Sequence, residues 1–304
     1  VMDYAATWQT NNVTVSPNGS EYIGGINSDA FLTTEGQSVT FVYIDGTQGW
    51  VNVLDSTSNV RGNPFLVATG GTITCSGNDK IHTFTSPGTF TVTQVSQTVP
   101  QNTISYMVVG GGGSSGRDDS TIRGTGGGGA GGFREFKGPA QTYCVSPLNG
   151  ATPITVTATG YPITVGAGGT GSPVAGCNTN GVPSVFSTVT SAGGGAGGCQ
   201  SPLAPIDNGS PGASGGGGGV GEATGTGGTG NTPPVSPAQG SNGGASSAQA
   251  PAIPAPANNV SGGGGGGATT VGGAGGPGSS GGGGTGATTS IPGSATAYGG
   301  GGGG

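Results

Sequence analysis

The chain has 304 residues, of which 75 are glycine and 21 are proline, and only 6% of them are charged. Its net charge of −6 argues against nucleic acid as a partner, because binding to phosphates needs a basic face. No stretch approaches the roughly 20 consecutive apolar residues of a membrane span, so we expect no membrane insertion.

Residues 1–60 are predicted to form a small β module. Residues 38–44 and 50–54 are rich in the β-branched and aromatic residues that strands favour. They flank residues 45–49, a loop that begins with the turn-forming pair Asp-Gly. The pattern therefore predicts a β-hairpin over residues 38–54.

A second small β unit is predicted over residues 61–109. Three strand-like segments, residues 71–75, 80–85 and 89–95, are separated by Ser-Gly-Asn-Asp and Ser-Pro-Gly, which both favour turns. An apolar segment at residues 104–109 leads directly into the first glycine run. No window of a dozen residues free of glycine and proline has helical periodicity, so we expect essentially no α-helix.

Residues 110–304 form a glycine-rich region in which two β-like segments remain, at residues 151–165 and 182–190. Glycine offers no side chain to bury and loses more conformational entropy on ordering than any other residue. The glycine runs are therefore either disordered or held by backbone hydrogen bonds between neighbouring segments. Runs of four or more glycines occupy residues 110–113, 126–129, 215–219, 262–267, 281–284 and 299–304.

The distribution of charge favours the ordered alternative. Disordered chains are usually rich in charge, whereas this chain has no Lys or Arg after Lys137 and no acidic residue there except Asp207 and Glu222. We expect polyglycine II, a left-handed threefold helix with no internal hydrogen bonds, packed side by side so that neighbours satisfy the backbone groups. The predicted fold is all-β with a glycine-rich C-terminal region of polyglycine II-like packed helices.

No group of residues has the pattern of a catalytic, metal-binding or cofactor-binding site. His82 is the only histidine, and its alternating strand position predicts a structural role. Residues 166–171 and 225–230 match the nucleotide-binding pattern G-x-G-x-x-G, but such matches arise by chance in this composition and neither opens a predicted helix. We therefore expect neither an enzyme nor a cofactor.

The charged residues near the start of the glycine-rich region are predicted to be solvated. Residues 117–119, Arg-Asp-Asp, are interpreted as an exposed loop, with a calcium or receptor contact as the alternative. Arg134, Glu135 and Lys137 are interpreted as a solvated strand face.

The cysteines have spacings that match no zinc pattern. We expect free thiols, with a disulfide between Cys177 and Cys199 as the alternative. The four are Cys75, Cys144, Cys177 and Cys199.

Two stretches resemble proteins of bacteriophage particles. Residues 7–55 resemble a β module of tail fibres and other virion proteins, on the motifs at residues 12–15, 17–20, 39–43 and 49–51. The following sequence resembles the glycine-rich domain of structural proteins from marine bacteriophages. That likeness rests on residues 68–72, 80–85, 88–92, 106–113, 126–133, 163–169 and 192–198.

The resemblance implies an extracellular virion appendage, a tail fibre that contacts other virion proteins and a host cell-surface receptor. The family usually ends in an apolar strand finishing with Arg-Tyr after the last glycine run, whereas this chain stops at Gly304, so we expect an incomplete C-terminus. The chain starts at Val1 rather than Met, so we also expect that an N-terminal part is missing. The alternative function is a structural subunit of a microbial extracellular filament or surface appendage.

Receptor contacts are expected in segments between the glycine runs, because the runs offer only backbone. The candidate segments are residues 202–211, 231–242 and 245–260, and the other interpretation is that they are plain connectors. Tyrosine is a suitable anchor because it offers contact area at low entropic cost. The candidate receptor-binding residues are Tyr143, Tyr161, Asp207, Asn231, Asn242, Asn259 and Tyr298.

A homotrimer is expected, since phage fibres are usually threefold and small β modules bury little surface alone. Its hydrophobic contact face is predicted to consist of Val39, Phe41, Tyr43, Trp50, Phe84 and Phe90.

Overall fold

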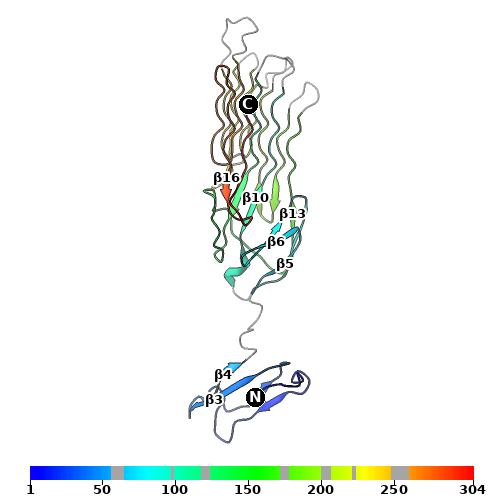
Figure 1. The fold of residues 1–304 in the computed structure, drawn as a ribbon, viewed down its shortest axis with the longest axis vertical. Coiled ribbons are helices and arrows are strands. Elements are labelled where there is room, and N and C mark those ends of the chain that lie inside the picture. The colour runs from blue at the N-terminus through cyan, green and yellow to red at the C-terminus, as the bar shows by residue number, and fades with distance from the viewer. Residues whose placement is uncertain are drawn as a thin grey trace. The chain divides into compact units, whose positions relative to one another are not determined.

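A computed structural model describes residues 1–55, 65–96, 99–117, 124–171, 178–199, 207–220, 224–247 and 260–304 (Figure 1). The described chain forms two compact units. One contains residues 1–55, and the other contains Leu66–Val95 and all described residues from Val99 onward. Within these ranges the structure has one short 3-10 helix, η1 (Val99–Asn102), and no α-helix.

The first unit consists of two antiparallel strand pairs. Strand β1 (Val13–Val15) pairs with β2 (Ala30–Leu32), and β3 (Val39–Asp45) pairs with β4 (Gly49–Asp55). The β3–β4 pair confirms the predicted hairpin. Its turn is fixed by the Asp45 carboxylate, which accepts hydrogen bonds from the N–H groups of Thr47 and Gln48 at 2.8 and 2.7 Å.

The core of the first unit is small. Its buried apolar residues are Trp8, Leu32 and Val39. The Asp3 carboxylate ties the N-terminal segment to this core, because it accepts hydrogen bonds from the N–H groups of Thr7, Trp8 and Gly36 at 3.0 to 3.1 Å. These bonds lower the pKa of Asp3 below its ordinary value, although burial of the carboxyl acts in the opposite direction.

The second unit contains a five-stranded antiparallel sheet, in the order β15-β14-β13-β8-β5. It is made of β5 (Val67–Thr69), β8 (Gly88–Gln94), β13 (Gly160–Thr164), β14 (Ser184–Phe186) and β15 (Val189–Ser191).

Four further strand pairs complete the β structure of this unit. They are β6 (Thr72–Ser76) with β7 (Asp79–Thr83), β9 (Thr103–Ile104) with β12 (Ile154–Thr155), β10 (Tyr106–Val109) with β11 (Phe133–Phe136), and β16 (Ala287–Thr289) with β17 (Thr296–Tyr298).

Aromatic side chains contact one another in the core of the second unit. The ring centroid of Phe186 lies 6.1 Å from that of Phe90 and 5.8 Å from that of Tyr106, both edge to face. Four strands that we expected in a separate small unit, β5, β8, β9 and β10, pack in one core with β12 and β14. The buried residues of this core are Ala68, Phe90, Val92, Tyr106, Val108, Ala151, Ile154, Val156, Phe186 and Val189.

The hydrophobic face expected to join subunits is largely used inside the chain. Val39 is buried in the first core, and Phe41 packs against it. Phe90 is buried in the second core, and Phe84 packs against that core. The remaining two residues of the predicted face, Tyr43 and Trp50, are 46% and 38% exposed.

The glycine runs are threefold helices joined by backbone hydrogen bonds, as residues 214–220 demonstrate. The N–H groups of Ser214, Gly217 and Val220 donate to the carbonyls of residues 130, 127 and 124. The N–H groups of Gly215 and Gly218 donate to the carbonyls of residues 241 and 244. The N–H groups of Gly216 and Gly219 donate to the carbonyls of residues 210 and 207. Since each neighbour is reached at every third residue, the backbone repeats every three residues, as in polyglycine II.

The same run also accepts hydrogen bonds from three other segments. Its carbonyl groups are bonded by N–H groups of residues 195 and 198, of residues 263 and 266, and of residues 225 and 228. It is therefore surrounded by six neighbours. The described glycine runs thus confirm the predicted packing, in which neighbouring segments supply the hydrogen bonds that each helix cannot make internally.

Close backbone approach explains why the interior positions are glycine. A Cβ at Gly217 would collide with the carbonyl of Gly263, and one at Gly265 with the carbonyl of Gly128, well inside the 3.0 Å that real Cβ contacts keep. At the edge of the bundle a Cβ at Gly282 would meet no atom within 4 Å. The interior therefore excludes any side chain at many positions, whereas part of the edge does not.

Strands and glycine runs are continuous at one end of the bundle. Strand β10 leads into Gly110, β15 into the run that starts at Ala192, and β17 into Gly299. Figure 1 shows the runs side by side along the second unit, with these strands at their base. We call this the strand end, and the opposite end of the runs the distal end.

Candidate functional site

The predicted receptor-binding residues are divided between the two ends of the bundle. Asp207 lies at the distal end, where its carbonyl accepts a hydrogen bond from Gly219. Asn231 lies at the strand end, close to Gln239, whose carbonyl accepts from the N–H of Phe133 in β11. Residues 202–206 and 248–259, and therefore Asn259, lie outside the described residues.

The two candidate asparagines within the described residues, Asn231 and Asn242, accept hydrogen bonds from the backbone. The Asn231 carboxamide oxygen accepts from the N–H groups of Val235 and Gln239, both at 3.2 Å. The Asn242 carboxamide oxygen accepts from the N–H of Gly230 at 2.8 Å and so supplies a bond that a neighbouring run would otherwise supply. Both side-chain oxygens are thus engaged within the chain.

The three tyrosines lie in the β part of the second unit. Tyr161 packs against the aromatic core, and its hydroxyl accepts from the N–H of Thr157 at 2.8 Å. Tyr298 packs beside Phe133. Burial and the neighbouring Glu135 carboxylate raise the pKa of Tyr143 above its ordinary value. Each of the three rings is partly buried.

The predicted solvated face at Arg134 and Glu135 is wrong. Arg134 is 7% exposed and donates to the carbonyls of Pro237 at 2.6 Å and Ser236 at 3.3 Å. Glu135 is 0% exposed, and its carboxylate accepts from the N–H of Ser146 and the hydroxyl of Thr289. The sequence did not indicate this burial, because the donors come from segments up to 154 residues away.

The described residues contain no cluster of three His, Cys, Asp or Glu side chains that could hold a metal ion. His82 is structural in its contacts, since its Nδ1 lies 2.8 Å from the carbonyl oxygen of Gly70 and its ring packs against Phe90. Cys75, Cys144 and Cys199 carry free thiols, while Cys177, like Asp118 and Asp119, lies outside the described residues.

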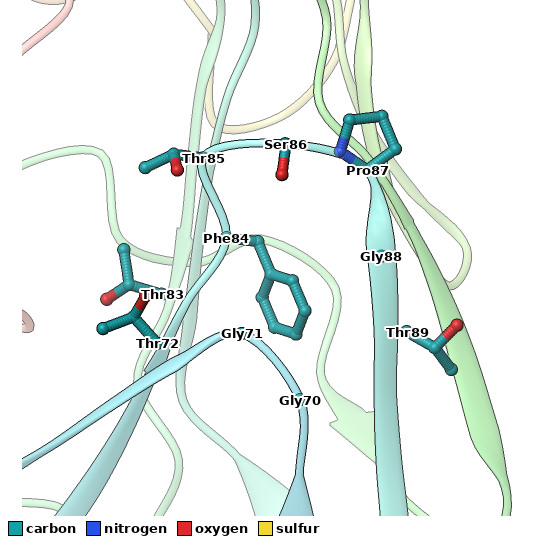
Figure 2. Close-up of a pocket in the computed structure, with 10 residues that line it drawn as sticks. All are labelled: Gly70, Gly71, Thr72, Thr83, Phe84, Thr85, Ser86, Pro87, Gly88 and Thr89. Atoms are coloured by element: carbon teal, nitrogen blue, oxygen red, sulfur yellow. The ribbon is translucent and has the colours of Figure 1, made fainter.

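A surface hollow of about 380 Å³ provides a concave site in the β part (Figure 2). Two turns border it. Gly70 and Gly71 connect β5 to β6, and residues 84–87 connect β7 to β8. We call this the Phe84 hollow. Its lining residues are Gly70, Gly71, Thr72, Thr83, Phe84, Thr85, Ser86, Pro87, Gly88 and Thr89.

Glycines on both sides hold the Phe84 ring. A Cβ at Gly88 would lie 3.3 Å from Cδ1 and Cε1 of the ring, and one at Gly71 would lie 3.1 Å from Cε2 and Cζ on the opposite edge. Gly70 and Gly71 have φ of +105° and +65°, conformations that side chains disfavour. The contacts are at the ring's edges, and Figure 2 looks onto its face.

Hydroxyl side chains lie along the turns and strands that border this ring. Figure 2 shows the Ser86 hydroxyl directed toward the ring, whereas the side chains of Thr72, Thr83, Thr85 and Thr89 are directed away from it. Within the described chain, none of these five hydroxyls makes a hydrogen bond, and no charged side chain lines the hollow. The sequence indicated only strands and turns for these residues.

The glycine-rich region matches a known family. The model of the family described as "Glycine-rich domain" matches residues 85–304. No curated protein and no solved structure matches the chain. In the part of the chain that the structure describes, there is also no helix that could cross a membrane.

Proposed function

Because the chain belongs to the glycine-rich domain family over most of its length, we propose that it is a structural protein of a bacteriophage virion. In this proposal it forms part of a tail fibre, is extracellular, assembles as a homotrimer and contributes to binding of a host receptor. The resemblance of residues 7–55 and 68–198 to virion proteins supports the assignment to a phage particle.

The observation that carries the proposal is the hydrogen-bonded glycine bundle. Its interior at residues 213–219 contains backbone, with only the small side chains of Ala213 and Ser214, and so provides rigidity without reactive groups. A rigid scaffold that presents chain segments at its ends suits a fibre, since binding function usually resides in loops held by such a scaffold.

The distal end is the better candidate for display. The described residues that flank residues 118–123, 172–177, 200–206, 221–223 and 248–259 all lie at this end. The supporting hydrogen bonds join residues 116 and 126, 124 and 220, 179 and 114, 207 and 219, and 247 and 261. Residues 231–239 at the strand end are instead bonded into the fold through Gln239. We therefore assign any receptor contact to the distal end.

The test is immunogold electron microscopy of phage particles with antibody against this chain, combined with adsorption assays. Labelled fibres, and purified protein that blocks adsorption, are expected. Replacing residues 248–259 by a Gly/Ser segment of equal length should reduce blocking, while the bundle keeps its protease resistance. Unlabelled particles would reject the virion assignment, and labelled particles without blocking would reject the receptor role alone.

A filament subunit is the second candidate, and the bundle edge favours it. The N–H groups of Gly282, Gly283, Gly300 and Gly303 are exposed and bond to no other described residue. Glycine runs of another copy could continue the hydrogen bonding at this edge. Long polymers of purified protein in electron micrographs would support this function over the fibre, and particles of constant small mass would exclude it.

A further inference from the structure

We infer that Asn18 is a site of spontaneous covalent modification, at which asparagine is converted to aspartate and isoaspartate, whereas the other Asn-Gly pairs of the chain are protected by the fold. A glycine after asparagine favours this reaction, because glycine has no side chain to hinder the attack of its own backbone nitrogen. The modification needs only water and is independent of the proposed virion role. The sequence contains five Asn-Gly pairs, which begin at Asn18, Asn149, Asn180, Asn208 and Asn242.

The reaction takes place between two groups of the same pair. The glycine nitrogen loses its proton and bonds to Cγ of the asparagine, and the carboxamide NH2 leaves as ammonia, which gives a cyclic imide. Water then adds to one of the two imide carbonyl carbons and breaks its bond to nitrogen, which leaves aspartate or isoaspartate. The first step requires the carboxamide to approach the glycine nitrogen. A pair therefore reacts slowly where hydrogen bonds hold these two groups in other positions.

In four of the pairs the asparagine carboxamide is held. Its oxygen accepts a hydrogen bond from a backbone N–H group at least 12 residues away in the sequence. These bonds, of 2.8 to 2.9 Å, run from Lys137 to Asn149, from Ala196 to Asn180, from Thr226 to Asn208 and from Gly230 to Asn242.

The glycines of the same four pairs are held as well. The N–H groups of residues 150, 181, 209 and 243 donate to the carbonyls of residues 135, 194, 226 and 228, at 2.8 to 3.1 Å. Both reacting groups of each pair must therefore leave their hydrogen bonds before they can meet. Exposure does not account for this protection, because Asn180, Asn208 and Asn242 are exposed to solvent, as Asn18 is.

The pair at Asn18 lacks these restraints. Within the described chain, neither the Asn18 carboxamide nor the Gly19 N–H makes a hydrogen bond. Both residues are exposed, in a turn that is closed by the bond from the N–H of Glu21 to the Asn18 carbonyl at 3.1 Å. A Cβ at Gly19 would meet no atom within 4 Å, so the space beside the reacting nitrogen is open.

The product alters this turn. In isoaspartate the main chain continues through Cγ, so the carbonyl that accepts from Glu21 becomes part of a carboxylate outside the main chain. The Asn27 carboxamide, which donates to the carbonyls of Gly19 and Glu21, would lose the alignment of its two acceptors. The new carboxylate also adds negative charge to a unit that has acidic residues but no Lys or Arg among residues 1–55. Since its core is small, we expect the first unit to lose stability as the modification accumulates.

Peptide mapping by mass spectrometry tests the inference. The full chain is incubated at mildly alkaline pH, and the aspartate and isoaspartate products of each pair are followed over time. Synthetic peptides that each contain one pair with its neighbouring residues give the rates without the fold. We expect Asn18 to react at nearly the rate of its peptide, and each other pair at least about tenfold more slowly than its own peptide, because hydrogen bonds must open first.

Asn18→Gln is the diagnostic variant, because it keeps a carboxamide but requires closure of a larger ring, which is slower. It should abolish the product at this position. Asn242→Gln is the matched control, since it removes a protected pair and should leave the product at Asn18 unchanged. Tryptophan fluorescence then reports on the structural effect, because Trp8 and Trp50 both lie in the first unit. After incubation, the parent should unfold at a lower temperature than Asn18→Gln, whereas fresh samples of the two should unfold together.

Two results would overturn the inference. One is that Asn18 in the folded chain reacts more slowly than its peptide by as large a factor as the other pairs do. The other is that a second pair in the folded chain reacts as fast as Asn18. Equal unfolding temperatures of the incubated parent and the incubated Asn18→Gln would reject the expected effect on the first unit.

Discussion

The β parts of the molecule and the glycine bundle reach order by different physical means. In the β part of the second unit, aromatic rings such as Phe186 and Phe90 exclude water from a core. In the bundle, backbone groups satisfy one another across distances that leave no room for a Cβ. The first arrangement depends on side-chain identity and the second on side-chain absence, so the two regions should fail under different substitutions.

The largest effect is expected from Gly265→Val. The new side chain would overlap the carbonyl of Gly128 and separate runs that are joined by several hydrogen bonds, each contributing about 1 kcal/mol net. We expect a loss of more than about 4 kcal/mol in bundle stability, observed as rapid proteolysis of residues 110–304. Gly264→Val, which meets the carbonyl of Gly282, should behave in the same way.

Gly282→Ala is the matched control for this prediction. A Cβ there meets no atom within 4 Å, so protease resistance should match that of the parent protein. Hydrogen exchange adds an independent measurement. The amides of residues 262–267 should exchange slowly in the parent and rapidly in Gly265→Val. Equal resistance of Gly265→Val and Gly282→Ala would contradict a packed glycine interior.

Phe186→Ala should produce the next largest effect, now on the side-chain core. Phe186 is 7% exposed and contacts Phe90, Tyr106 and Tyr161, so truncation should lower the free energy of unfolding by about 3–5 kcal/mol. Thermal denaturation followed by near-ultraviolet circular dichroism measures the loss. Phe31→Ala, at a residue that is 64% exposed, should change little, and a comparable loss there would undermine the assignment of the core.

Thr289→Val tests a contact between the β part of the second unit and a strand that follows a glycine run. Thr289 is buried in β16, which follows a glycine run, and its hydroxyl donates to the buried Glu135 carboxylate. Removing one donor from a buried carboxylate should lower the free energy of unfolding by about 1–3 kcal/mol. Chemical denaturation provides the measurement, and Thr288→Val on the exposed face of the same strand is the control. Identical stabilities of the two variants would argue against a structural role for the carboxylate.

The smallest expected effect is a loss of stability at acid pH, which should occur in the first unit and not in the bundle. Because the pKa of Asp3 is lower in the folded state, its contribution to stability is present above the ordinary value of 3.8 and is lost as the pH falls through the folded-state value. Fluorescence reports on this unit alone, since the only tryptophans are Trp8 and Trp50. Asp3→Asn should flatten the acid dependence of the fluorescence transition.

The bundle should respond differently to acid. Its described runs from residue 207 onward contain one acidic residue, Asp207, and no basic residue. Protease resistance of the bundle should therefore be nearly constant where the tryptophan signal changes. Parallel loss of both signals would indicate that the two units do not unfold independently.

The sequence was sufficient for the features that depend on local chemistry. The β3–β4 hairpin followed from its Asp45-Gly46 turn, and the threefold helices followed from glycine runs that lack charge. The hairpin of β16 and β17 was missed, because its strands of three residues are too short to give a periodic signal. The local sequence pattern therefore predicted the secondary structure of these segments.

What each segment contacts could not be predicted in the same way. Any glycine run can bond to any other, so nothing in residues 214–220 specifies their six neighbours. The burial of Glu135 depends on Thr289, and the partial burial of Tyr143 and Tyr161 depends on packing with segments distant in sequence. The Phe84 hollow likewise arises from two turns that come together only in the folded chain.

The order of the glycine runs in space has a consequence for synthesis of the protein. Residues 126–132 are among the first of the bundle to leave the ribosome, yet their hydrogen bonds run to residues 263, 266 and 302. Contacts with such long sequence separation form slowly. The bundle can therefore close only after residue 302 has been synthesised. Until then, the early glycine runs of a nascent chain must be kept from bonding to those of neighbouring nascent chains.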